Sequence, residues 1–186
     1  MAMLSAAGVI FTPVAADIDE EAVKSALVAR VLSPKDLATA LAVAKVRSLV
    51  GRYPLSCIIG CDQTLECHDG SLLNKASSLT ELGEQLHDLS GQSHWLHSAS
   101  VAFERGDQTW MAVESVRLKM RVLSRAFVDE YVARFGQSVL GCVGGYQIEE
   151  VGVQLFEQID GSHFAIMGLP LLPLLAFLRE RGMMMA

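Results

Sequence analysis

One stretch of the chain decides the fold: residues 57–65, which read Cys57-Ile58-Ile59-Gly60-Cys61-Asp62-Gln63-Thr64-Leu65. Apolar residues run directly into a carboxylate and an amide, and a turn at His68-Asp69-Gly70 then leads on to Lys75. The pattern predicts a buried strand that ends in an acid, and open α/β sheets bind their ligands at the carboxyl ends of strands. We therefore expect Asp62 to be the centre of a functional site.

Helical and strand patterns alternate on both sides of this stretch. Ser33-Pro34-Lys35-Asp36 is typical of a helix start, because Ser caps the first turn and Pro is tolerated at the first helical position. Two segments of alternating hydrophobicity, residues 93–103 and 109–122, are joined by a polar turn and predict an antiparallel hairpin. Further helices are expected over residues 22–31, 80–89, 124–135 and 169–181, and short strands over residues 9–11 and 153–159.

The order of these elements predicts an α/β fold with a mixed sheet and α+β character, not a doubly wound parallel fold. We expect a single domain over residues 1–186, with two lobes around a central cleft. One lobe would comprise residues 1–78 and 138–186, and the other residues 79–137.

Composition narrows the classes of partner. A net charge of −6 provides no general attraction to nucleic acid or to an anionic membrane, so we expect neither as a partner. The most apolar run, residues 164–178, is too short to cross a bilayer and is interrupted by Pro170 and Pro173.

The 4 cysteines form no Cys-x-x-Cys pair, and the start of the sequence shows no secretory signal. Reduced thiols and a cytoplasmic location are therefore favoured.

The common nucleotide motifs are absent, since the sequence has neither a GxxxxGK[ST] loop nor a GxGxxG turn after a strand. A set of carboxylates, Glu20, Asp62 and Glu149, accompanies two separated lysines, Lys45 and Lys75. This set suits a metal-assisted attack of water on a phosphate, which is one of several reactions that the residues permit. The acids would hold Mg²⁺ or Mn²⁺ and deprotonate the water, while the lysines would neutralise phosphate oxygens.

Two of these residues also have simpler local explanations. Glu20 belongs to an acidic run before a predicted helix, where negative charge complements the helix dipole without any metal. Lys45 lies one residue beyond a predicted buried stripe and so at its edge, where a surface lysine can extend its stem over apolar side chains. The stripe comprises Leu37, Leu41, Ala44 and Ser48.

Short motifs along the chain resemble those of the Maf family of nucleoside triphosphate pyrophosphatases, in the same order and from Leu4 to Gly182. They are Ala16-Asp-Ile-Asp-Glu20, Leu41-Ala-Val-Ala-Lys45, Ile58-Ile-Gly-Cys-Asp-Gln63, Asp69-Gly70 before Lys75, Leu89-Ser-Gly91, residues 152–161 and Gly168-Leu-Pro-Leu171. The resemblance implies a fold like that of Maf and inosine triphosphate pyrophosphatases. It also implies hydrolysis of a nucleoside triphosphate to its monophosphate and pyrophosphate with a divalent metal, in proteins that are often homodimers.

The resemblance also implies roles for individual residues. Asp62 would be the general base and, with Glu20, a metal ligand, while Lys45 and Lys75 would contact phosphates. Members with Asp-Gln at the position of Asp62 resemble those that act on 7-methyl-GTP. Gln63 and Glu149 are therefore expected to bind the substrate, because their acceptors could read the N1–H and N2 amine of guanine. We expect a purine, and in particular a modified guanine nucleotide.

Two departures from the family pattern affect this interpretation. Ala76 follows Lys75 where the family usually has Pro, and the sequence starts beyond the family's N-terminal strand and Ser-x-Ser-x-x-Arg loop. We expect either a start placed too far downstream or a truncated paralogue. A native N-terminal peptide that begins at Met1 would rule out the first explanation. The alternative function is a catalytically impaired nucleotide-binding or cell-division-associated regulatory protein that keeps the fold.

Overall fold

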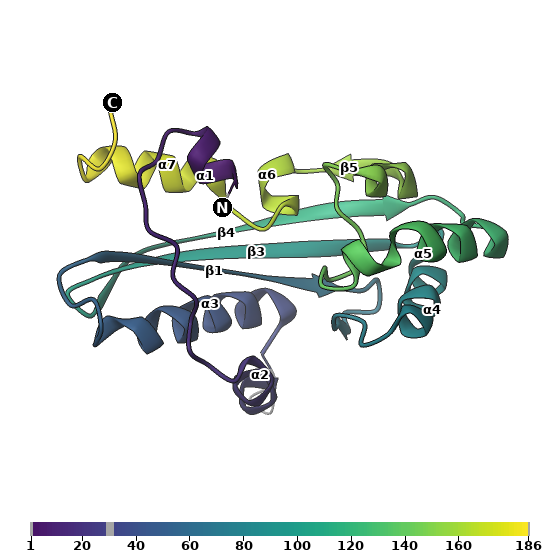
Figure 1. The fold of residues 1–186 in the computed structure, drawn as a ribbon, viewed down its shortest axis with the longest axis horizontal. Coiled ribbons are helices and arrows are strands. Elements are labelled where there is room, and N and C mark those ends of the chain that lie inside the picture. Colours follow the sequence, from purple (N-terminus) through teal and green to yellow (C-terminus); the bar gives the residue numbers. More distant parts are fainter. Residues whose placement is uncertain (1, 29–31, 186) are drawn as a thin grey trace. The chain divides into compact units, whose positions relative to one another are not determined.

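A five-stranded sheet with the order β2-β1-β3-β4-β5 organises the chain in a computed structural model that describes residues 2–28 and 32–185 (Figure 1). The turn between β3 and β4 places Arg105 and Gly106 at φ 55° and 91°. Positive φ at both positions suits the twist of a two-residue hairpin. The predicted hairpin and the mixed α/β fold class are confirmed. The strands are β1 (Cys57–Glu66), β2 (Leu72–Leu73), β3 (Ser93–Glu104), β4 (Asp107–Met120) and β5 (Phe156–Asp160).

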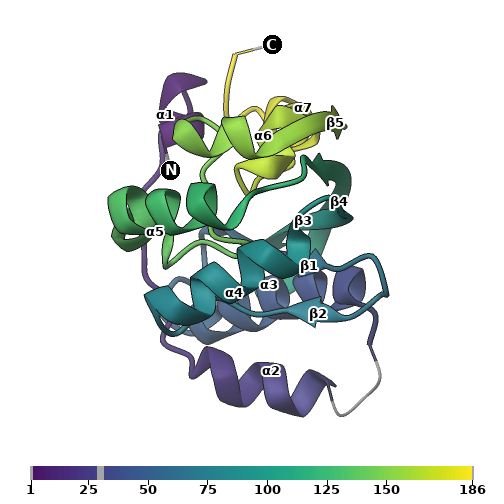
Figure 2. The same cartoon turned by 90° about the vertical axis from the view of Figure 1, so that its right-hand side faces the viewer.

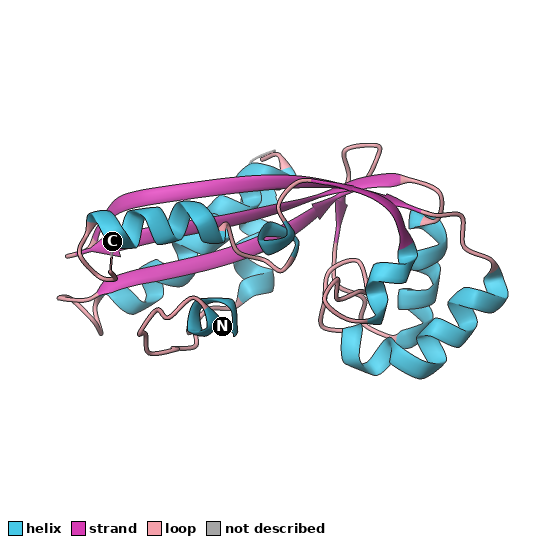
Figure 3. Ribbon diagram, turned by 90° about the horizontal axis from the view of Figure 1, so that it is seen from above, coloured by secondary structure: helices cyan, strands magenta, loops and turns pink. Residues whose placement is uncertain are grey.

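Helices precede, connect and follow the strands (Figure 3). They are α1 (Ala2–Ala6), α2 (Glu20–Val28), α3 (Pro34–Val50), α4 (Leu79–Leu89), α5 (Arg125–Val139), α6 (His163–Ile166) and α7 (Leu171–Glu180), with a 3₁₀ turn η1 (Val151–Leu155). Ser33, Ser78 and Ser124 each accept a backbone N–H of the following first turn, and the cap at Ser33 is as the sequence predicts. Among the described residues, no helix is both long enough and apolar enough to cross a membrane.

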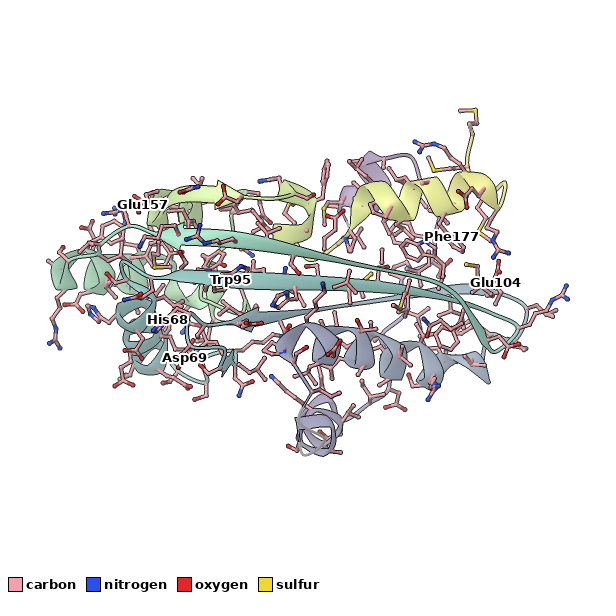
Figure 4. All side chains as sticks on the ribbon, turned by 180° about the vertical axis from the view of Figure 1, so that it is seen from behind. His68, Asp69, Trp95, Glu104, Glu157 and Phe177 are labelled. Atoms are coloured by element: carbon pink, nitrogen blue, oxygen red, sulfur yellow. The ribbon has the colours of Figure 1, made fainter. Side chains whose placement is uncertain are left out.

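The chain folds as two units, and the first comprises residues 1–63, 98–114 and 168–186. Helix α3 lies along β1 in this unit (Figure 1), and its alanines allow close packing on the sheet. Phe177 of α7 stacks on Trp110 of β4 with ring centroids 5.1 Å apart, and Arg181 forms an ion pair with Glu104 at 2.8 Å. Figure 4 labels Phe177 and Glu104. The buried residues that join α3 to the sheet are Ala38, Ala42, Val46, Ala99, Val101 and Phe103.

The second unit comprises residues 64–97 and 115–167, and strands β1, β3 and β4 contribute residues to both units. Its helices α4 and α5 pack against each other (Figure 2). Residues 138–167 belong to this unit, whereas the predicted lobes place residues 138–186 with residues 1–78. The reason is that β5 pairs with β4, while the Tyr146 ring packs on Phe156 of β5, with centroids 4.8 Å apart.

The position of Asp62 within β1 corrects the sequence-based expectation. β1 does not end at this acid but continues to Glu66, because Leu65 and Glu66 pair with the short antiparallel strand β2. Asp62 is therefore an internal strand residue. Its place in the site must come from what packs against the middle of the strand, not from a strand end.

Three smaller expectations also differ from the structure. Residues 9–11 form no strand, and Ile10 is 98% exposed. The late strand begins at Phe156, because η1 occupies the residues before it. The buried face of α3 includes Ala38, Ala42 and Val46, whereas Ser48 of the predicted stripe is exposed. The predicted extension of α2 through residues 29–31 lies outside the described residues.

Candidate active site

The structure brings three of the predicted site residues together within the first unit. The ammonium nitrogen of Lys45 lies 2.8 Å from Oδ2 of Asp62 and 2.9 Å from Oε1 of Glu20. The exposed fraction of the side chain rises from 9% for Asp62 to 25% for Lys45 and 43% for Glu20. The three residues thus form a row that runs from the sheet to the surface, with the most buried group being the carboxylate on β1.

A glycine lets the helix that carries Lys45 approach the strand that carries Asp62. A Cβ built on Gly60 would lie 2.5 Å from a methyl group of Val46 and 2.7 Å from the backbone oxygen of Ala42, both in α3. Gly60 and Asp62 are two residues apart in β1, so they share one face of the strand. Lys45 lies in the helical turn between Ala42 and Val46, and the close approach therefore places its ammonium beside Asp62.

The other carboxylate of the row comes from the start of α2. Asp19 accepts the backbone N–H of Ala22 at 2.9 Å through its side chain, which caps the first turn of this helix. Glu20 follows at the first helical position and reaches Lys45 from there. The acidic run therefore has both expected roles. Asp19 caps the helix, and Glu20 forms the ion pair with Lys45.

Burial and the neighbouring charges shift the pKa of the Asp62 carboxyl in opposite directions. Desolvation raises the pKa of its carboxyl above the ordinary value, although the hydrogen bond and charge of Lys45 lower it, as does the backbone N–H of Gln63 at 2.7 Å. Burial lowers the pKa of Lys45, but the Asp62 and Glu20 carboxylates outweigh it and the net pKa is raised. Asp62 Oδ2 is buried, and the Lys45 ammonium 2.8 Å away is what stabilises its negative charge. A buried carboxylate oxygen of this kind is a suitable proton acceptor.

The backbone N–H of Gln63 contacts the Asp62 carboxylate, but the Gln63 side chain does not lie beside it. Successive strand residues point to opposite faces, and the Gln63 amide donates to Oγ of Ser98 in β3 at 2.8 Å. The thiol of Cys61, on the same face as Gln63, donates to Oγ of Ser100 at 3.4 Å. Sequence reasoning missed these buried serines as partners, because only the pairing of β1 with β3 identifies them.

Lys75 and Glu149 belong to the second unit, and the structure does not join them to the row formed by Glu20, Lys45 and Asp62. Both side chains are exposed. Their charges both act on the Cys142 thiol, whose pKa is raised by burial and by Glu149 and lowered by a hydrogen bond with Gln147 and by Lys75. Both predicted substrate contacts therefore belong to the part of the second unit whose charges act on Cys142.

Comparison with known proteins gives a consistent result over the whole chain. The family described as Maf-like protein matches residues 1–181. A nucleoside triphosphate pyrophosphatase of Ruegeria pomeroyi is 46% identical over 97% of this chain and 90% of its own length. A protein with the same name from Roseobacter denitrificans is also 46% identical over the same shares. A 7-methyl-GTP pyrophosphatase of Brucella abortus is 43% identical over 96% of this chain and 89% of its own length.

These matches agree with the short motifs that carry Glu20, Lys45 and Asp62, which the structure brings to one place. The family match covers more than nine-tenths of the sequence and includes every one of these residues. The chain belongs to the Maf family.

Proposed function

We propose that this protein is a nucleoside triphosphate pyrophosphatase, which hydrolyses the bond between the α- and β-phosphates of its substrate. The observation that carries the proposal is the row of Asp62, Lys45 and Glu20, with a buried carboxylate oxygen next to a cation. Relatives that are 42–46% identical are named for this activity, which supports the same reaction here.

The carboxylates of the row suit a divalent cation. Mg²⁺ usually binds to one or two protein carboxylates and completes its coordination with water and substrate phosphates. Among residues 2–28 and 32–185, no group of three or more His, Cys, Asp and Glu side chains could hold a metal by itself. Glu20 and Asp62 would therefore hold Mg²⁺ or Mn²⁺ together with the substrate. A bound cation would neutralise phosphate oxygens and lower the pKa of the attacking water.

The residues of the row then have distinct tasks. Asp62 accepts the proton of water through Oδ2, as the water oxygen forms a bond with phosphorus and the phosphoanhydride bond breaks. Lys45 lies within 3 Å of both carboxylates, so it limits their mutual repulsion and provides a positive charge for the phosphates. The products are a nucleoside monophosphate and pyrophosphate.

The substrate that we favour is a guanine nucleotide modified at N7. The names of relatives such as the Brucella abortus protein support this preference, because they specify 7-methyl-GTP. Lys75 and Glu149, whose charges both reach Cys142, are the proposed contacts for phosphate and base in the second unit. Gln63 remains a proposed substrate contact on the basis of the family resemblance.

A panel of nucleotides tests the proposal. The protein is incubated with 7-methyl-GTP, GTP, ATP, dTTP and UTP in the presence of Mg²⁺ or Mn²⁺, and pyrophosphate and orthophosphate are measured separately. We expect stoichiometric pyrophosphate and monophosphate, with 7-methyl-GTP as the best substrate. Orthophosphate alone would indicate removal of the terminal phosphate and would contradict the proposed reaction. Nucleotide binding without any product would favour a regulatory protein.

A further inference from the structure

A second group of polar residues joins three strands in the second unit, and the proposed pyrophosphatase reaction does not use it. His97 of β3 lies between Glu66 of β1 and Ser115 of β4. Its Nε2 is 2.9 Å from Oε2 of Glu66, and its Nδ1 is 2.8 Å from Oγ of Ser115. A hydroxyl, an imidazole and a carboxylate in hydrogen-bond contact have the geometry of a base-activated nucleophile.

The carboxylate determines which ring nitrogen of His97 carries the proton. A carboxylate can only accept a hydrogen bond, so the Nε2 proton is donated to Glu66. When the imidazole is neutral, its Nδ1 is then a lone-pair acceptor to which the hydroxyl of Ser115 can donate. In that state the Ser115 proton points at the atom that would receive it.

The imidazole of this group is buried, whereas the hydroxyl is accessible to solvent. The His97 side chain is 7% exposed and that of Glu66 is 29% exposed, whereas Ser115 lies on the surface. A buried base with an accessible hydroxyl is the arrangement that a nucleophile requires. Ser138 of α5 differs, because its hydroxyl donates to the backbone oxygen of Phe135 at 2.8 Å and has no imidazole partner.

A fixed positive charge accompanies Ser115 on β4. Arg117 is two residues further along the strand and so on the same face. Its guanidinium donates to Oγ of Ser93 at 2.9 Å and lies 3.6 Å from Oδ2 of Asp160. The cation is therefore held on the same face of β4 as Ser115, next to the carboxylate of Asp160.

We propose that Ser115 is a nucleophile that reacts with small carboxylic esters. Its oxygen forms a bond with the carbonyl carbon, and its proton passes to Nδ1 of His97, while Glu66 stabilises the resulting imidazolium. The bond between the carbonyl carbon and the ester oxygen breaks, and the leaving alcohol takes the proton from His97. Water then attacks the acyl-serine by the same route, which releases the acid and restores Ser115.

Two reagents test this site in the full-length protein. Phenylmethanesulfonyl fluoride forms a stable adduct with reactive serines and releases fluoride, and peptide mass spectrometry locates the adduct. p-Nitrophenyl acetate measures turnover through the coloured p-nitrophenolate that it releases. We expect Ser115 to be sulfonylated about 100-fold faster than Ser138, in line with the usual contribution of a general base. Ser115→Ala should abolish that adduct and remove the corresponding part of the esterase rate.

Variants of His97 and Glu66 test whether these residues activate Ser115. His97→Gln should lower the rate of Ser115 sulfonylation by about 100-fold, and Glu66→Gln by about tenfold. If His97→Gln does not fold, as judged by thermal unfolding, the partly exposed Glu66 provides the decisive variant. Asp62→Asn should leave the adduct unchanged, which separates this site from the proposed pyrophosphatase. Labelling of Ser115 at the rate of Ser138, or equal labelling in the wild-type protein and Glu66→Gln, would overturn the proposal.

Discussion

At the residue scale, the chemistry of the proposed site rests on the balance between burial and charge at Asp62. Desolvation raises the pKa of this carboxyl, and the neighbouring Lys45 counteracts the rise. Lys45 itself tolerates burial because two carboxylates contact its ammonium. Each charge of the row is thus held in place by the next one.

Removing the cation should change the pH dependence of hydrolysis. In Lys45→Met, the pKa of Asp62 should rise further, because the hydrogen bond and charge that lower it are lost. A general base acts in its deprotonated form, so the acidic limb of kcat/KM should move to higher pH. Its maximum should also fall by about 100-fold, as expected for a lost electrostatic contact in a transition state. Lys35→Met, at an exposed position of the same helix, is the control and should keep the wild-type profile.

His94 provides a separate test on stability, because burial lowers its pKa from 6.5 to about 4. The unfolded chain binds a proton below pH 6.5, whereas the folded protein does not until about pH 4. The contribution to stability is therefore complete above pH 6.5 and is lost as the pH falls towards 4, and it amounts to about 3 kcal/mol.

Urea unfolding between pH 7.5 and pH 5 measures this effect. We expect the free energy of unfolding to fall less steeply with decreasing pH in His94→Gln than in the wild-type protein. The exposed His163 is the control position, and His163→Gln should keep the wild-type slope. Equal slopes in His94→Gln and the wild-type protein would show that the histidine does not titrate as the structure requires.

At the scale of elements, the packing of α3 on β1 connects stability with activity. Gly60→Ala places a methyl group in a space already occupied by Val46 and the backbone of Ala42. We expect a loss of stability of about 1–3 kcal/mol from overpacking, measured by thermal unfolding. The helix must also shift, so kcat/KM should fall as Lys45 moves relative to Asp62.

A matched substitution distinguishes overpacking from a general effect of the added methyl group. Gly51 ends the same helix, and a Cβ built on it has no other atom within 4 Å. Gly51→Ala should therefore keep the wild-type stability within about 1 kcal/mol. A similar loss in both variants would remove Gly60 as the reason for the close approach.

The loop that carries Lys75 should depend on α4 for its order. Glu81 accepts the backbone N–H of Ser77 at 2.7 Å, and Gln85 donates to the backbone oxygen of Asn74 at 3.2 Å. These bonds hold the loop although Ala76 stands where the family usually has Pro. In Glu81→Ala, the substrate must order the loop at a cost of about 1 kcal/mol, which corresponds to an increase in KM of about fivefold.

Steady-state kinetics with 7-methyl-GTP separate KM from kcat for this variant. We expect kcat to change by less than about twofold, because the loop positions a binding residue and not the reacting groups. Glu84→Ala is the control, since Glu84 is an exposed residue of the same helix. An unchanged KM in Glu81→Ala would show that the loop does not need this support.

At the scale of the whole molecule, local sequence patterns predict most of the helices and strands. The features that the sequence does not predict depend on pairing between strands far apart in the chain. Serine caps and the Arg105-Gly106 turn act within a few residues, so the helices and the hairpin could be expected from the sequence. The internal position of Asp62 depends on pairing of β1 with β2, which no local pattern specifies. The predicted lobes, residues 1–78 with 138–186 and residues 79–137, divide the chain between elements, whereas three strands contribute residues to both units.

The candidate site, like the fold, is predictable from the sequence only in part. Residue type and the family resemblance both single out Glu20, Lys45 and Asp62 in the sequence, and the structure brings them together. The sequence does not predict the group formed by Glu66, His97 and Ser115. Its members lie on three strands and are separated by 31 and 18 residues. Only the register of the sheet brings such residues into contact.

The most direct test of the proposed function is the turnover of Asp62→Asn with 7-methyl-GTP and Mg²⁺, measured with nucleotide binding. Asparagine has nearly the same shape but cannot accept the proton of water. We predict that kcat falls by about 10²–10⁴-fold, while the dissociation constant stays within about threefold of the wild-type value. Asp88→Asn, at an exposed position, should retain full activity. Pyrophosphate release by Asp62→Asn at the wild-type rate would contradict the assignment of Asp62 as the general base.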